Sequence, residues 1–170
     1  MLTRSSLVAT IVLALAAAPV AAEEVQTRLT GYEEVPAIST EGSGVFRAHI
    51  SPDDSTITWE LSYADLEGDV LQAHIHFGQH SVNGGIVVFL CTNLGNGPAG
   101  TQTCPAPPAT ISGTVTSAGV VGGASTQLIT PGELDEVIRA IRAGAAYVNV
   151  HSSVAPGGEI RGQLRSSSRP

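Results

Sequence analysis

Thr56-Ile-Thr-Trp-Glu-Leu-Ser-Tyr63 shows the clearest alternation of apolar and polar residues in this sequence of 170 residues. Side chains along a β-strand point to opposite faces in turn, so Ile57, Trp59, Leu61 and Tyr63 share one face. The four residues in the other positions are polar and share the opposite face. The segment therefore predicts a strand with one face on an apolar core and the other in water.

Further strand-like runs occur on both sides of this segment, separated by turn residues such as Ser51-Pro-Asp-Asp-Ser55. Residues 86–90 are all apolar, which is typical of a strand buried on both faces. Short strands at this spacing predict an all-β fold, an antiparallel Greek-key β-sandwich or barrel of about seven or eight strands. We expect the other strands at residues 26–30, 44–50, 70–77, 86–90, 110–116, 145–151 and 159–164.

One segment departs from the strand pattern. Thr130-Pro-Gly-Glu133 has the sequence of a capping box, with Thr130 as the N-cap and Glu133 at the third helical position. Apolar residues follow at helical spacing as far as Gly144, a residue type that often ends helices. We therefore predict one short inserted helix at about residues 131–143.

The first 22 residues are organised like a secretory signal peptide. Arg4 precedes an apolar run over residues 7–18, and Val20-Ala-Ala22 matches a cleavage site. We expect cleavage near Ala22, a single domain over residues 23–165, and a flexible tail at 166–170. The mature protein would then be secreted or periplasmic.

The composition argues against two classes of partner. The chain has 15 acidic and 8 basic residues and a net charge of −7, and none of the basic residues is a lysine. Nucleic acids and anionic membranes reward clustered Lys and Arg, so we expect neither nucleic-acid binding nor membrane insertion. No stretch after the signal peptide reaches the ~18 apolar residues that a membrane span needs.

Cys91 and Cys104 are the only cysteines in the sequence. Export to an oxidising compartment predicts a disulfide between them. Closing a loop of about 14 residues would stabilise the fold by roughly 3 kcal/mol. The alternative is a metal site that contains cysteine, but the intervening Gly/Pro-rich loop lacks the usual ligand spacing.

Three histidines occur in two of the predicted strands. His74 and His76 point to the same face of their strand, with Cα atoms roughly 6.5 Å apart. That face is opposite to the apolar face of the strand, so we expect the two histidines away from the core or at a sheet edge. His151 ends a second strand, on which it shares a face with Asn149. Together the three imidazoles suggest a transition-metal site.

Imidazole ligands suit copper or zinc. We expect copper, because copper handling is common in oxidising compartments, with zinc as the alternative. Three ligands would leave one position open for chemistry, whereas a fourth would close the site. His80 is a candidate fourth ligand and His49 a weaker one; otherwise both are solvated residues.

Three further polar residues are candidates for orienting a ligand histidine by hydrogen bonding. Asn149 lies on the face of His151, and Glu159 and Arg161 alternate on one face of the last strand. The second interpretation of Glu159 and Arg161, and the one that we favour, is a structural ion pair across neighbouring strands.

Four segments, in this order along the chain, resemble the chordin-type CHRD domain, which is found in many bacteria. The resemblance covers nearly the whole mature length and implies an extracytoplasmic β domain. The segments are Leu29-Thr-Gly-Tyr-Glu-Glu-Val-Pro36, Ala73-His-Ile-His-Phe-Gly78, Tyr147-Val-Asn-Val-His151 and Pro156-Gly-Gly-Glu-Ile-Arg-Gly-Gln163.

A second similarity concerns the histidines alone. His74, His76 and His151 resemble the copper ligands of Cu/Zn superoxide dismutases, which are also Greek-key β-barrels. The chain shows no clearly placed bridging histidine and no second cluster of His and Asp for zinc. Arg161 is the one candidate for the electropositive funnel that such an enzyme needs for its anionic substrate.

Three hypotheses follow. The leading one is an exported protein that binds a single transition metal ion through His74, His76 and His151 and serves in metal binding or handling. The second is a metal-free extracytoplasmic interaction or structural module. The third is a dismutase-like redox enzyme. No nucleophile elbow, phosphate loop or dinucleotide fingerprint supports another enzyme class.

Overall fold

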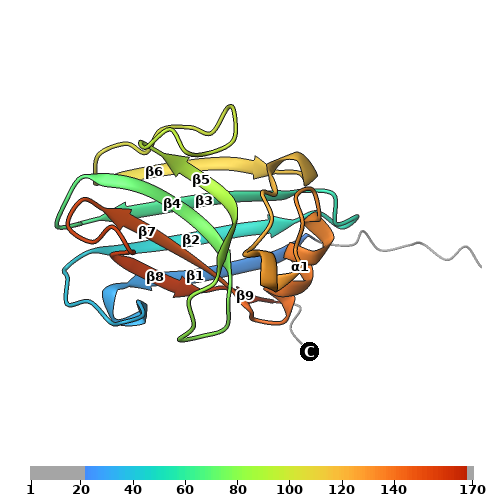
Figure 1. Ribbon diagram of the computed structural model, residues 1–170, viewed down its shortest axis with the longest axis horizontal. Coiled ribbons are helices and arrows are strands. Elements are labelled where there is room, and N and C mark those ends of the chain that lie inside the picture. Colours follow the sequence, from blue (N-terminus) through green and yellow to red (C-terminus); the bar gives the residue numbers. More distant parts are fainter. Residues whose placement is uncertain (1–21, 168–170) are drawn as a thin grey trace, which may run out of the picture.

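The computed structural model describes residues 22–167, which form nine β-strands, one α-helix and three short 3-10 helices (Figure 1). Residues 1–21, almost all of the predicted signal peptide, lie outside the described residues. The strands are β1 (Glu23–Thr30), β2 (Ser43–Ile50), β3 (Ile57–Ala64), β4 (Val70–Phe77), β5 (Gly85–Thr92), β6 (Ala109–Val115), β7 (Ala146–Ser152), β8 (Ile160–Gln163) and β9 (Arg165–Ser166). The helices are α1 (Leu134–Arg142) and the 3-10 helices Gly31–Glu33, Ser117–Gly119 and Ser125–Gln127.

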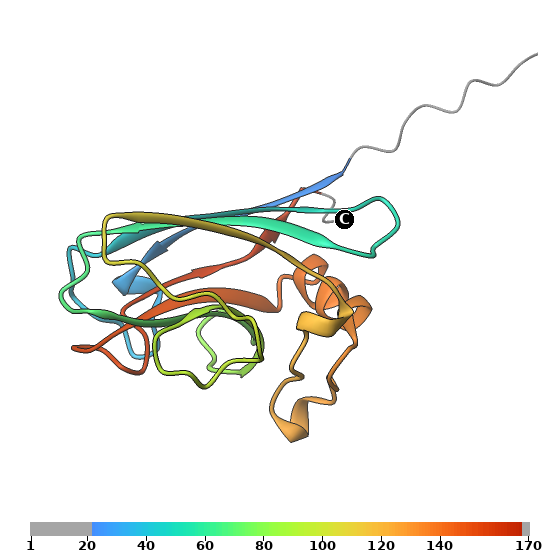
Figure 2. The same ribbon diagram turned by 90° about the horizontal axis from the view of Figure 1, so that it is seen from above.

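The strands form one antiparallel sheet in the order β5-β4-β7-β8-β1-β2-β3-β6, with β9 beside β1. This sheet folds over on itself, so that β4, β5, β7 and β8 form one layer and β1, β2, β3 and β6 the other (Figure 2). The chain crosses between the layers from β3 to β4, from β5 to β6 and from β6 to β7. Near the two sheet edges, Val88 of β5 bridges to Val120. The sheet is therefore nearly closed as a barrel, and the predicted antiparallel all-β fold is confirmed.

The apolar core lies between the two layers. Ile57, Trp59, Leu61 and Tyr63 of β3 are buried and the residues between them are exposed or half-buried, as the alternation predicts. The strands of the other layer differ, because every residue of β7 and β8 is buried. This second layer is therefore covered on its outer face as well as on its core face.

The inserted helix is shorter than its sequence signal. Glu133 accepts a hydrogen bond from the backbone N–H of Thr130 (2.8 Å), which is one half of the predicted capping box, but the first helical residue is Leu134. Gly132 has φ +94°, a left-handed conformation that cannot be part of an α-helix, so the helix begins after it. Gly144, with φ +68°, follows the helix as predicted.

The C-terminal segment is paired further than expected. Arg165 and Ser166 form β9 beside β1, and the backbone N–H of Ser167 donates to the Glu24 carbonyl (2.8 Å). The first two residues of the predicted tail are thus hydrogen-bonded, and residues 168–170 lie outside the described residues. None of the helices in residues 22–167 is long and apolar enough to cross a membrane.

Candidate metal centre

Two neighbouring strands bring the three histidines together. In the pairing of β4 with β7, His74 lies opposite Asn149. His151 is two residues further along β7 and lies opposite Gln72. His74 and His76 are on the face of β4 away from the core, as predicted. They are nevertheless buried, with exposed fractions of 0% for His74, 7% for His76 and 6% for His151. The expectation of a sheet edge is wrong, because β4 lies between β5 and β7.

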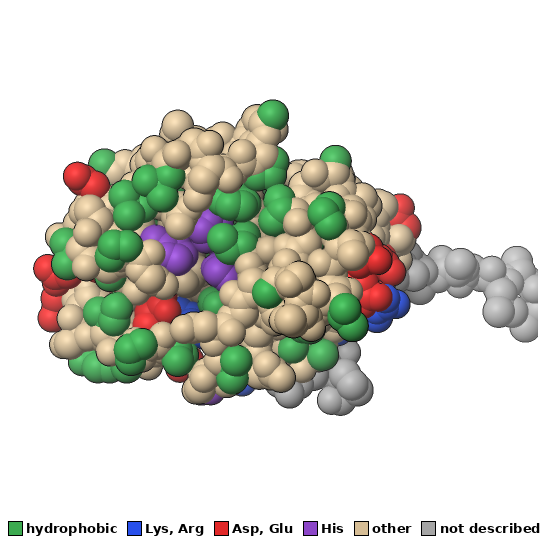
Figure 3. All heavy atoms as spheres, in the orientation of Figure 1, with side chains coloured by type: hydrophobic (Ala, Val, Ile, Leu, Met, Phe, Trp, Pro, Cys, Tyr) green, Lys and Arg blue, Asp and Glu red, His purple; other side chains and the backbone are tan. Residues whose placement is uncertain are grey.

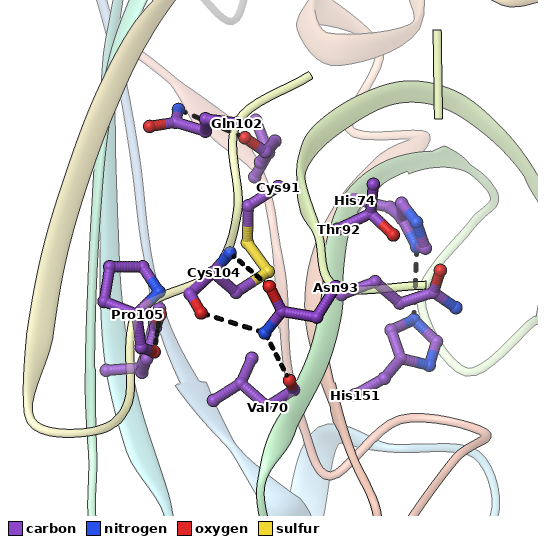
Figure 4. Close-up of a disulfide and its surroundings, with 12 residues drawn as sticks. Val70, His74, Cys91, Thr92, Asn93, Gln102, Cys104, Pro105 and His151 are labelled. Atoms are coloured by element: carbon purple, nitrogen blue, oxygen red, sulfur yellow. Dashed lines mark hydrogen bonds between the residues drawn. A yellow bond between two sulfur atoms is a disulfide. The ribbon is translucent and has the colours of Figure 1, made fainter. Parts of the chain in front are cut away.

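The histidine nitrogens converge on one point. One candidate ligand atom from each residue lies within 4.8 Å of the others. Nδ1 of His74 and Nε2 of His151 are 3.3 Å apart (Figure 4). Two nitrogens bound to one tetrahedral ion at about 2.0–2.1 Å would be separated by about the same distance. Figure 3 shows histidine side chains gathered in a hollow near the middle of this face of the molecule.

Backbone carbonyls fix the orientation of two of the rings. Nδ1 of His76 donates to the Gly84 carbonyl and Nδ1 of His151 donates to the Pro156 carbonyl, both at 2.9 Å. With the proton on Nδ1, the Nε2 atom of each ring carries the lone pair that a metal binds. Nε2 of His76 and Nε2 of His74 are buried and have no hydrogen-bond partner. Buried polar atoms are rarely left unpaired, so Nε2 of His76 is a ligand candidate, whereas on His74 the nitrogen that faces His151 is Nδ1.

Burial also keeps the rings neutral. It lowers the pKa of His74 to about 2, and the neighbouring His151 and His76 add to that effect. It lowers the pKa of His76 to about 4, against the opposing effect of the hydrogen bond to Gly84. The pKa of His151 is lowered for the same reason. All three imidazoles are thus neutral at neutral pH, with one proton on each ring, which is the form that coordinates a metal.

Arg161 holds the loop that covers the site. Its guanidinium donates to the side chain of Asn83 (3.1 Å) and to the carbonyls of Gln79 (3.2 Å) and Val82 (2.9 Å). The same loop, residues 78–84, supplies the Gly84 carbonyl that orients His76. Arg161 therefore acts on the histidine cluster through the loop.

An aromatic ring separates Arg161 from His76. The guanidinium carbon of Arg161 lies 3.5 Å from the centroid of the Tyr147 ring. The ring of Tyr147 stacks on that of His76, at 4.7 Å between centroids and 3° between planes. The Tyr147 hydroxyl accepts from the Gly84 N–H (3.2 Å), which ties the ring to the loop as well. Tyr147 is therefore part of the wall of the site.

Glu34 is a neighbour of the site that the sequence analysis missed. Its carboxyl is buried near the side chain of Asn149, whose Oδ1 lies 3.1 Å from Nε2 of His151, and its Oε1 has no hydrogen-bond partner. Burial raises the pKa of Glu34 to about 7, although the nearby charge of Arg161 acts in the opposite direction. The only signal for Glu34 was its place in the segment Leu29–Pro36, which carries the family resemblance.

Three residues considered in the sequence analysis lie apart from the cluster. Glu159 is buried but accepts hydrogen bonds from the Thr40 hydroxyl (2.7 Å) and the Glu67 N–H (2.8 Å). It therefore forms no ion pair with Arg161, which had been the second interpretation. His80 is exposed and pairs with Glu33 at 3.0 Å. His49 is exposed on β2, in the opposite layer.

The disulfide lies beside the histidine strand. Cys91 of β5 is bonded to Cys104 and lies opposite Ala73, the residue before His74 (Figure 4). The side chain of Asn93 holds this region together, because it bonds the Val70 carbonyl (2.8 Å) and both backbone groups of Cys104. The predicted disulfide is confirmed, and both cysteines are thereby excluded as metal ligands.

Comparison with known proteins gives one match. The family model described as CHRD domain matches residues 25–164, which include all three histidines. No curated protein and no solved structure shows significant similarity to the chain. Within residues 22–167, His74, His76 and His151 are the only group of His, Cys, Asp or Glu side chains that converge closely enough to share an ion.

Proposed function

We propose that this chain, which belongs to the CHRD domain family, binds a single transition metal ion through His74, His76 and His151. The observation that carries the proposal is the combination of convergence and unpaired lone pairs. Three neutral imidazoles meet at one point, and two of their Nε2 atoms are buried without a hydrogen-bond partner. A bound ion would satisfy Nε2 of His76 and offset the free energy that its burial costs, and it would be reached by the nitrogen of His74 that faces His151.

Copper is the ion that we propose. Imidazole nitrogens suit both copper and zinc, and at a given site Cu²⁺ binds more tightly than Zn²⁺. The disulfide between Cys91 and Cys104 fits an oxidising compartment, in agreement with secretion or export to the periplasm. We propose that the protein binds or handles copper there. One coordination position remains for a small molecule or a partner's ligand, since the cluster supplies three nitrogens.

The test is the copper affinity of His151→Gln compared with that of His80→Gln. Both variants remove one imidazole, but His80 is exposed and lies outside the cluster. We expect His151→Gln to weaken copper binding at least about 100-fold, more than is typical for the loss of an orienting neighbour. His80→Gln should bind like the wild type. The thermal stability of both variants without metal provides the folding control.

Three results would count against the proposal or its choice of metal. Absence of tight copper binding by the wild type, or equal losses in both variants, would leave a metal-free interaction module as the better description. Tighter binding of zinc than of copper, measured by competition against the same chelator, would overturn the choice of metal and keep the site.

A further inference from the structure

The arginines of the described chain fall into two groups. Arg139 pairs with Glu136 and Asp135, Arg142 pairs with Glu23 and Asp54, and Arg161 bonds the loop over the histidines. Within residues 22–167, the side chains of the other three arginines form no ion pair and no hydrogen bond. These three are Arg28, Arg47 and Arg165.

The three unpaired arginines lie together on the outer face of the layer opposite the histidines. Gln26 of β1 lies opposite Arg47 of β2 on one side and opposite Arg165 of β9 on the other. Arg28 is two residues further along β1 and therefore points to the same face. All three arginine side chains are exposed. We call this surface, made by Arg28, Arg47 and Arg165, the arginine face.

Two adjacent hollows open on the arginine face. The larger, of about 360 Å³, is lined by all three arginines together with Gln26, Thr27 and Val45. The smaller, of about 250 Å³, is lined by Arg28 and Arg165 with Thr27, Thr30, Gln163 and Glu33, whose carboxylate pairs with His80. Neighbouring strands are about 4.8 Å apart, so the three guanidinium groups can reach anionic groups spaced by roughly 5–10 Å.

The grouping is unfavourable for the protein alone. Like charges on neighbouring strands repel each other and destabilise a sheet. Acidic residues outnumber basic ones by 15 to 8, so carboxylate partners are plentiful in the chain. Even Glu60, which lies opposite Arg47 in the pairing of β2 with β3, forms no ion pair with it. The three guanidiniums therefore keep their donors available for an external anion.

We propose that the arginine face binds an anionic oligosaccharide, one that carries sulfate, phosphate or carboxylate groups. Guanidinium groups bind such anions with paired, charge-assisted hydrogen bonds. The threonine and glutamine side chains that line the hollows are suited to sugar hydroxyls. This binding does not depend on the metal centre.

Two other anionic partners fit less well. A lipid surface would be met by exposed apolar side chains, but the large exposed ones lie elsewhere, at Tyr32, Val82, Leu94, Leu128 and Val154. A nucleic acid needs a long basic track, and the net charge of −7 would oppose it beyond the span of three arginines.

The experiment measures binding of a fluorescent sulfated dextran fragment by the whole mature protein at low and at physiological salt. We expect binding by the wild type that weakens with salt, and none to the unsulfated fragment. Arg47→Gln should weaken binding about tenfold, the effect of losing one charge-assisted contact. Arg139→Gln changes the net charge equally but alters an arginine that pairs on α1, and it should stay within about twofold of the wild type.

Four results would overturn the proposal. They are failure of the wild type to bind the sulfated fragment, equal binding of the unsulfated fragment, equal weakening by Arg139→Gln, and tighter binding to a DNA duplex or to phosphatidylglycerol vesicles than to the sulfated fragment. Copper should leave the affinity unchanged, which keeps this test separate from that of the metal centre.

Discussion

The outer faces of the two layers of this sandwich are used in opposite ways. On the layer of β4, β7 and β8, the loop over residues 78–84 covers the surface and buries polar side chains, among them His74, Asn149 and Arg161. On the layer of β1, β2 and β3, comparable polar side chains remain in water, as Arg47 and Glu60 do. Burying a polar group costs free energy unless it is paired, whereas an exposed charge costs little. The covered face therefore gives up stability for ligands held in fixed positions.

Lowering the pH should affect the covered face most, because its titratable side chains are buried. The three histidines have lowered pKa values in the folded state, so the unfolded chain binds more protons than the folded chain once the pH falls below about 6.5. Glu34, with its pKa raised to about 7, has the opposite effect. Between about pH 4.5 and pH 7 its carboxyl is protonated in the folded state and ionised in the unfolded chain. His74 and His76 alone give about two protons against the one of Glu34, so we expect the unfolding free energy of the metal-free protein to fall by at least about 1 kcal/mol per pH unit between pH 6 and pH 5.

Denaturant unfolding at each pH measures this loss. The His151→Gln variant should show a shallower pH dependence, because it has lost one of the three buried imidazoles with lowered pKa values. A stability that does not change between pH 6.5 and pH 5 would contradict the assignment of neutral buried rings.

A pair of arginine substitutions compares the two faces directly. Arg161→Ala removes three hydrogen bonds to the covering loop and the contact with Tyr147, and we expect it to lower the unfolding free energy by about 3 kcal/mol. Arg47→Ala, on the open face, should change the unfolding free energy by less than about 0.5 kcal/mol. Chemical denaturation of both variants measures the two effects. Similar losses would mean that the loop is not held by Arg161.

Two neighbouring glycines give a smaller but more local comparison. A Cβ atom on Gly158 would lie 2.4 Å from Oε1 of Glu34 and 2.7 Å from Nδ2 of Asn149, and its φ is +128°. A Cβ on Gly157 would meet nothing within 4 Å. We expect Gly158→Ala to lower the unfolding free energy by about 2 kcal/mol and to weaken copper binding, because it displaces Glu34 and also Asn149, which contacts His151.

Gly157→Ala is the matched control, and we expect it to have almost no effect on either quantity. Thermal denaturation and a copper titration of the two variants check this prediction. If Gly158→Ala bound copper as well as Gly157→Ala does, Glu34 and Asn149 would have no part in positioning His151.

The strands and the histidines were predictable because their signals are local. The period of two in residues 56–63 marks a strand, and the spacing of His74 and His76 places both rings on one face. The cover over those rings was not predictable in this way. It depends on contacts between distant segments, such as that of Arg161 with Val82 and that of the Asn83 side chain with the Val35 carbonyl (3.0 Å).

Contacts between distant segments also explain why the residues around the histidines were predicted incorrectly. Glu159 has the same alternation as Arg161, yet it bonds to Thr40 and to the backbone of Glu67, in two loops that no local pattern places beside it. Glu34 comes to Asn149 through the fold of the chain and not through its spacing. The helix began late for a local reason, since Gly132 adopts a left-handed conformation within the capping box.

The most direct test of the metal centre is the copper content of the untagged protein, purified from the compartment in which it accumulates. We predict about one copper ion per chain, with three imidazole nitrogens at about 2.0 Å in the X-ray absorption spectrum, and loss of the copper in His76→Gln. A protein that carries no copper, or a His76→Gln variant that retains as much copper as the wild type, would contradict the proposed site.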